Sequence, residues 1–265
     1  MDDRPIGVFD SGVGGLTVVN ALSNALPNES ICYVGDTARV PYGNKSTQRI
    51  KQYSHEIAEW LMHKNCKMIV VACNTVSSLA MDYLQSVFPL PVIGVIQPGA
   101  DYAIQITKNN KIGVIGTQAT IQSNAYVKAL HSIMPDIKVI SKACPLFVPL
   151  VEEGIVDGDI PLSIADFYLK DIQSSDIDTV ILGCTHYPLL KKIIGTVLGS
   201  RITLIDSGNA IARAVIFELD KHNLISTIKK GETQCFVTDD PKYFDVFASK
   251  YLHTPITETQ HIDLS

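Results

Sequence analysis

Short apolar runs separated by helix-length stretches constrain the fold of this chain more than any other feature. Several of the runs are apolar throughout rather than alternating, which is typical of strands buried on both faces of a parallel sheet. The predicted strands are Ile6–Phe9, Ile31–Val34, Met68–Ala72, Val92–Ile96, Ile112–Ile115, Lys138–Ile140, Thr179–Leu182, Ile202–Ile205 and Cys235–Val237.

The stretches between these runs have helical periodicity. Residues 50–61 carry an apolar side chain every three or four positions, after a Ser46 or Thr47 that can serve as the N-cap. Alternating strands and helices predict an α/β fold with right-handed crossovers.

The chain also contains a weak internal duplication. The run Ile6–Phe9 is echoed by Ile112–Ile115, and the segment VVACNT around Cys73 is echoed by ILGCTH around Cys184. The glycine of each first run precedes its cysteine by a similar distance, 66 and 71 residues. Two echoes in the same order predict two related α/β halves, and the alternative is a chance similarity of buried strands.

Charge and composition exclude several classes of partner. The net charge is −5 and no basic tract offers a surface for phosphates, so we expect no nucleic-acid partner. No apolar stretch approaches the roughly 18–20 residues that span a bilayer, and from the first residues we expect no secretory signal. We therefore expect a cytoplasmic protein without a membrane partner.

Six cysteines occur without a Cys-x-x-Cys pair. In a reducing compartment they should be free thiols, and a structural zinc site is not expected. Cys73 and Cys184 differ from the others because each falls at the carboxyl end of a predicted strand, where ligands bind in open α/β sheets. A helix should follow each, with Thr75 or Ser77 as cap after Cys73. A thiol at a helix N-terminus is favoured as thiolate, although a free cysteine is often just a small buried apolar residue.

Two opposed thiols define a specific chemistry. Inverting a stereocentre by proton transfer needs a base on one face of a carbon and an acid on the other, and a thiolate and a thiol meet that need. Asp10, after the first strand, and His186, two residues after Cys184, can each assist one thiol. The alternatives are a turn at Asp10 and a surface position for His186. The glycine-rich segment 12–15 can receive an anion on its amides or form a tight turn.

Six segments, in this order, resemble those of bacterial glutamate racemases. They are 10–17 (DSGVGGLT), 33–36 (YVGD) with 41–43 (PYG), 72–75 (ACNT), 149–154 (PLVEEG), 183–188 (GCTHYP) and 205–208 (IDSG).

This resemblance implies interconversion of L- and D-glutamate with no cofactor and no metal, supplying D-glutamate for peptidoglycan. It implies that Cys73 and Cys184 are the two acid/base residues, and that Asp10, Glu152 and His186 assist them. The residues implied to hold the substrate are Asp10, Ser11, Pro41, Tyr42, Gly43, Asn74, Thr75, Thr117, Thr120, Thr185 and His186.

The resemblance also implies the architecture. We expect two pseudo-symmetric α/β domains with mainly parallel sheets and the active site in the cleft between them. The first domain would comprise residues 1–96 plus 207–265 and the second residues 97–206. A homodimer is expected, without dependence on a cell-wall precursor as activator.

The residues are also compatible with four other functions. They are a racemase for aspartate or another small amino acid, a cysteine hydrolase or acyltransferase with His186 as base for Cys184, a silent binding protein, and a metal site at Cys184 and His186.

Overall fold

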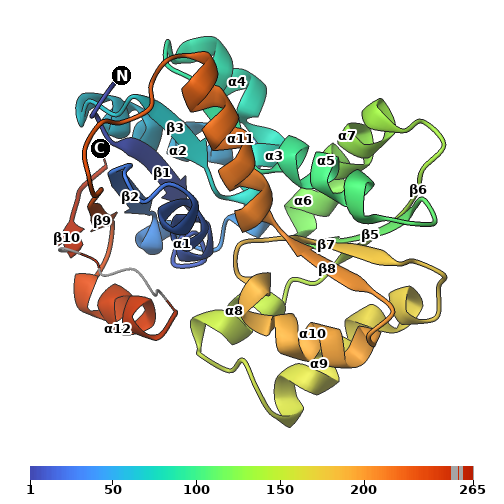
Figure 1. Cartoon of the computed structure of the whole chain (residues 1–265). Coiled ribbons are helices and arrows are strands. Elements are labelled where there is room, and N and C mark those ends of the chain that lie inside the picture. Colours follow the sequence, from blue (N-terminus) through green and yellow to red (C-terminus); the bar gives the residue numbers. More distant parts are fainter. Residues whose placement is uncertain (252–255, 257–258, 265) are drawn as a thin grey trace.

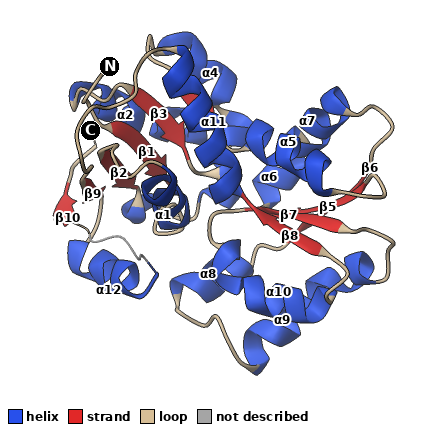
Figure 2. Ribbon diagram, in the orientation of Figure 1, coloured by secondary structure: helices blue, strands red, loops and turns tan. Residues whose placement is uncertain are grey.

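The computed structural model describes residues 1–251, 256 and 259–264, and these form two parallel sheets covered by helices (Figures 1 and 2). The first sheet has the order β10-β9-β2-β1-β3-β4 and the second the order β6-β5-β7-β8. The strands of the first sheet are β1 (Ile6–Asp10), β2 (Ile31–Gly35), β3 (Met68–Val71), β4 (Val92–Gly94), β9 (Thr233–Val237) and β10 (Thr259–His261). Those of the second are β5 (Lys111–Gly116), β6 (Lys138–Ala143), β7 (Thr179–Gly183) and β8 (Thr203–Asp206).

Four consecutive strands of the first sheet, β2-β1-β3-β4, have the same order as the whole second sheet. Numbered within each half, both read second, first, third, fourth strand, and all pairs are parallel. The residues of β1, β2, β3 and β7 are buried throughout, as uniformly apolar runs require. The shared topology agrees with the sequence echoes and supports two related halves.

Helices cover both faces of each sheet (Figure 1). They are α1 (Leu16–Ala25), α2 (Thr47–His63), α3 (Asn74–Leu79), α4 (Met81–Val87), α5 (Ile96–Ile106), α6 (Gln118–Gln122), α7 (Ala125–Ile133), α8 (Phe147–Glu152), α9 (Asp159–Gln173), α10 (Lys191–Leu198), α11 (Ser207–Lys221) and α12 (Pro241–Tyr251). Short 3-10 turns lie at η1 (Thr37–Arg39), η2 (Tyr42–Asn44) and η3 (Tyr187–Leu190).

All nine predicted strands are present, and the departures from prediction are local. Ile96 begins α5 instead of ending β4. Ser46 caps α2 as predicted, accepting a hydrogen bond from the Arg49 amide. The predicted caps Thr75 and Ser77 are wrong, because α3 already begins at Asn74 and Cys73 itself occupies the N-cap position.

The chain passes between the two sheets twice, from β4 into α5 and from β8 into α11 (Figure 1). The first sheet is therefore built from residues 6–94 and 233–261, and the second from residues 111–206. This membership supports the division into domains 1–96 plus 207–265 and 97–206, which stays a prediction. In the described part of the chain, no helix combines the length and apolar character needed to cross a membrane.

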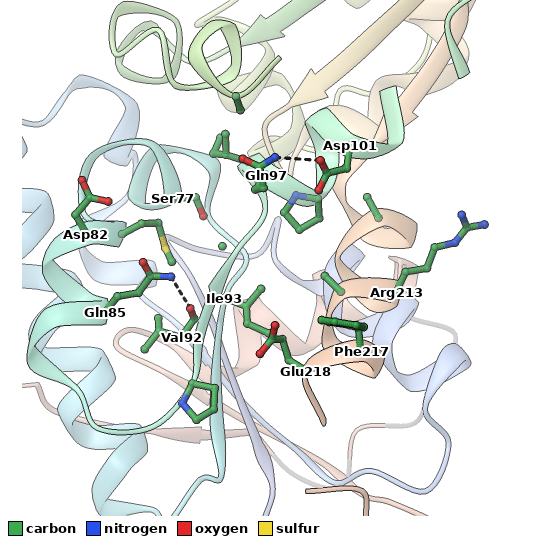
Figure 3. Close-up of a pocket in the computed structure, with 18 of the residues that line it drawn as sticks. Ser77, Asp82, Gln85, Val92, Ile93, Gln97, Asp101, Arg213, Phe217 and Glu218 are labelled. Atoms are coloured by element: carbon green, nitrogen blue, oxygen red, sulfur yellow. Dashed lines mark hydrogen bonds between the residues drawn. The ribbon is translucent and has the colours of Figure 1, made fainter. Parts of the chain in front are cut away.

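A wide hollow of about 1330 Å³ lies where α4, β4, α5, α7 and α11 meet (Figure 3). Two of its polar side chains donate hydrogen bonds within the lining, Gln97 to Asp101 and Gln85 to the carbonyl of Val92. None of the predicted site residues lines this hollow.

Candidate active site

Cys73 and Cys184 line one small cavity between the two sheets. Cys184 directly follows β7, and Cys73 follows β3 after one residue, so the thiols come from equivalent strands of the two halves. Both are nearly fully buried. The cavity volume is about 20 Å³, room for about one water molecule. Its lining is Ser11, Val40, Pro41, Tyr42, Gly43, Cys73, Asn74, Thr75, Thr117, Val148, Cys184, Thr185 and His186.

Asp10 ends β1 beneath this cavity and is fully buried. Its carboxylate accepts hydrogen bonds from the Gly15 amide at 2.9 Å and from the Thr185 hydroxyl at 3.2 Å. It thus ties the glycine-rich turn of the first half to the residue after Cys184. Burial raises the pKa of Asp10, against the lowering effect of the nearby His186.

The pKa of Cys73 is raised, opposite to the direction expected from its helix N-terminus. Burial is the largest cause and the neighbouring Asp10 carboxylate adds to it. The Val76 amide and the Ser11 side chain act in the predicted direction, as hydrogen-bond donors that lower the pKa, but burial outweighs them. At neutral pH Cys73 is therefore mainly a thiol.

His186 links Cys184 to Glu152. Its Nδ1 lies 3.8 Å from the Cys184 Sγ, and its Nε2 lies 2.6 Å from a Glu152 carboxylate oxygen. Burial by itself lowers the pKa of His186, but Cys184 and Glu152 raise it well above its usual range. A buried imidazolium between a thiol and a carboxylate can exchange a proton with the neighbouring sulfur.

Three threonine hydroxyls form a second polar group. Thr117 caps α6 and lies 3.0 Å from the Thr75 hydroxyl and 2.9 Å from that of Thr120. Thr120 does not line the cavity, but its hydroxyl is bonded to that of Thr117, which does. Because Thr75 belongs to the first half and Thr117 to the second, these hydroxyls join the halves beside the cavity.

Two further residues of the cavity wall, Tyr42 and Asn74, are hydrogen-bonded to residues that were not predicted as site residues. The Tyr42 hydroxyl donates to the buried carboxylate of Asp36, which lies within the quoted segment YVGD. The Asn74 amide is bonded by Tyr126 and Ser207. Ser207 lies in the quoted segment IDSG, whereas no sequence signal singled out Tyr126.

The predicted site residues are thus found together. Eleven of them, including Ser11 and Pro41, are in the cavity wall, and Asp10, Thr120 and Glu152 are bonded directly to wall residues. Among the residues that the structure describes, no three His, Cys, Asp or Glu side chains form a group that could hold a metal ion.

The sequence profile described as Asp/Glu/Hydantoin racemase matches residues 6–215. The chain belongs to this racemase family. It is 45% identical over 262 residues to the glutamate racemase of Geobacter metallireducens, covering 98% of this chain and 97% of that protein.

Solved structures of the racemase family superpose closely on this chain. The glutamate racemase isoform RacE1 of Bacillus anthracis is 41% identical with a TM-score of 0.96, and the match covers 100% of this chain and 99% of that one. The glutamate racemase of Francisella tularensis in complex with D-glutamate is also 41% identical, with a TM-score of 0.93 and the same coverage. The predicted family and the two-sheet α/β fold are confirmed.

Gly14 of this racemase-family chain packs directly against the residues around Cys184. A Cβ added there would lie 2.5 Å from His186 Nδ1 and 2.6 Å from the Thr185 hydroxyl. Gly14→Ala should therefore displace His186 and lower kcat/KM by about 100-fold, since a shift of about 1 Å can cost that much. Gly195→Ala is the matched control, because its Cβ would meet only Leu204 at 3.8 Å. Equal rates for the two variants would contradict the packing argument.

Proposed function

We propose that this chain interconverts L- and D-glutamate by two-thiol proton transfer, without a cofactor. The observation that carries the proposal is the pair of buried thiols, which reach one cavity from equivalent strands of two related halves. A planar carbanion held between them receives a proton on either face. Relatives over the full length of the chain are named glutamate racemases.

In the proposed mechanism one thiolate removes the α-proton while the opposite thiol protonates the other face. Cys73 acts on D-glutamate and Cys184 on L-glutamate. Asp10 assists proton transfer at Cys73. His186, together with Glu152, assists proton transfer at Cys184. Developing charge on the substrate is stabilised by preorganised donors, and the proposed donors are the Thr75 and Thr117 hydroxyls and the Asn74 amide, which belong to residues of the cavity wall.

Glu152→Gln should give an activity deficit that grows with pH. In the unsubstituted protein Cys184 and Glu152 hold the pKa of His186 well above its usual range, so His186 keeps its proton through neutral pH. Without the carboxylate that pKa falls, and the proton is lost as the pH rises through the lower value. The ratio of wild-type to variant kcat/KM should increase about tenfold from pH 6.5 to pH 8. A ratio that stays constant over this range would remove Glu152 from the proton relay.

Substrate entry requires the site to open. A cavity of about 20 Å³ is too small for a five-carbon amino acid, so the walls must separate and close again. Glutamate at about 100 times its Kd should slow amide exchange at Tyr42–Asn44 by roughly 10- to 100-fold. The amides of Lys108 and Asn109, which bond Asp178 far from the cavity, serve as control. Unchanged exchange at Tyr42–Asn44 would argue against closure around the substrate.

The decisive experiment is circular dichroism of the purified protein with L-glutamate and, separately, D-glutamate, in metal-free buffer without pyridoxal phosphate. We expect the optical signal to decay to zero from both enantiomers. No decay with glutamate but decay with aspartate would transfer the proposal to aspartate. No decay with either would favour a binding protein.

We further propose that the product D-glutamate is used for peptidoglycan and that the protein acts in the cytoplasm as a homodimer. Sedimentation at several concentrations tests the dimer. Depletion of this protein in its bacterium tests the metabolic role, because growth should then depend on added D-glutamate.

A further inference from the structure

We propose that Tyr126 and Ser207 are positioning residues that hold the Asn74 amide with one N–H directed at a carboxylate of the substrate. The inference deepens the proposed function and rests on it, because it takes glutamate as the molecule in the cavity. Neither residue lines the cavity, so both act through Asn74.

The three side chains form a buried hydrogen-bonded group. The Tyr126 hydroxyl donates to Asn74 Oδ1 at 2.7 Å, and Asn74 Nδ2 donates to the Ser207 hydroxyl at 3.4 Å. Each of the three residues is at most 4% exposed. Burial raises the pKa of Tyr126, against a hydrogen bond from Ser207 that lowers it, so the phenol stays protonated and remains a donor.

Two glycines fix the phenol ring in place. A Cβ at Gly183 would lie 3.1 Å from the Tyr126 ring, and one at Gly99 would lie 3.2 Å from its other edge. Both positions therefore let the ring approach the backbone closely. Gly183 directly precedes Cys184, so the same contact that holds Tyr126 also adjoins the catalytic strand end.

The Asn74 amide faces Tyr126 with its oxygen and Ser207 with its nitrogen, and the bond lengths agree with this orientation. A distance of 2.7 Å is normal for O–H···O, whereas N–H···O bonds are usually about 2.9–3.0 Å. The Asn74 Nδ2 carries two hydrogens, and Ser207 accepts one of them. The second is left for the cavity that Asn74 lines, where a carboxylate accepts it.

The group also spans the two halves of the molecule. Asn74 begins α3 beside the first sheet, Tyr126 lies on α7 beside the second, and Ser207 begins α11 where the chain returns. The amide is consequently oriented by contacts that form when the two halves come together.

Steady-state kinetics in both directions test the proposal. Tyr126→Phe leaves the amide free to turn and its buried oxygen unpaired, so KM for both enantiomers should rise about tenfold or more while kcat changes less than threefold. Ser207→Ala removes a longer bond and should raise KM about two- to threefold. Tyr168→Phe is the matched control. Tyr168 is buried and does not line the cavity, and its hydroxyl accepts a hydrogen bond from the Leu146 amide, so this substitution should leave both constants unchanged.

A double-substitution cycle separates positioning from general damage. If Tyr126 acts through Asn74, Tyr126→Phe should have no further effect on KM in an Asn74→Ala background. The proposal would be overturned if Tyr126→Phe raised KM equally in the Asn74→Ala background, or if Tyr126→Phe changed KM no more than Tyr168→Phe does. Either outcome would leave the proposed function intact. A wild-type protein that does not racemise glutamate would overturn both.

Discussion

Replacing Cys73 or Cys184 by serine should lower kcat/KM for glutamate racemisation by about 10³-fold or more. General acid–base groups contribute about 10²- to 10⁴-fold, and a hydroxyl is a far poorer base than a thiol at neutral pH. Each thiol serves as base in one direction and acid in the other. Because the two enantiomers have equal free energy, kcat/KM must stay equal in both directions, so either substitution slows both equally.

Deuterium uptake in heavy water distinguishes the two thiols where rates cannot. In Cys184→Ser, Cys73 can still remove the α-proton of D-glutamate and return deuterium to the same face without inversion. In Cys73→Ser, the same exchange should be seen with L-glutamate. Cys235→Ser is the control, since Cys235 is buried in β9 and does not line the cavity. Full activity in either active-site variant would exclude the two-thiol mechanism.

Lys67→Met should destabilise the protein by about 3–5 kcal/mol, the usual cost of leaving one member of a buried ion pair alone. The Lys67 ammonium lies 2.5 Å from the Glu29 carboxylate, and both side chains are at most 2% exposed. It also donates to the backbone carbonyls of Asp2 at 2.6 Å and Leu224 at 2.7 Å. The ammonium thus pairs with one carboxylate and donates to two backbone carbonyls, and the substitution removes these interactions together.

Urea denaturation measures this effect, with the double variant Lys67→Met/Glu29→Leu as control. Removing both charges should recover most of the loss and leave about 1–3 kcal/mol for the unpaired backbone groups. Lys67 precedes β3 at the end of the sheet opposite Cys73, so kcat should not change while the protein is folded. An unfolding free energy within about 1 kcal/mol of wild type in the single variant would show that the pair contributes little.

The strands were predictable because runs without polar residues must be buried on both sides. The strand β10 was missed for the same reason, since Thr259–His261 contains no apolar run and lies at the sheet edge. The location of Cys73 and Cys184 at the binding edge of the sheets was predictable, because each follows the carboxyl end of a predicted strand. The direction of the Cys73 pKa shift was not predictable, because the helix amides are local in sequence whereas burial depends on the packing of both halves.

Hydrogen bonds between residues far apart in the sequence could not be predicted from the pattern of residues alone. Asp10 and Thr185 are 175 positions apart, and Asn74 and Tyr126 are 52 apart. The resemblance to racemases named Asp10, Thr185 and Asn74 as site residues. It gave no reason to single out Tyr126, whose role depends on the close approach of a ring to Gly183.

In the proposed reaction, the protein does not return to its starting protonation state at the end of a turnover. Each turnover leaves the proton taken from the substrate on one cysteine and the opposite cysteine without its own, so the two thiols finish with exchanged protonation states. A protein that converts L-glutamate in one direction must restore the starting state before the next cycle. With room for about one water, that reset depends on the same opening that releases product. At high substrate concentration we therefore expect the recovery of the empty protein, rather than inversion at carbon, to limit the rate.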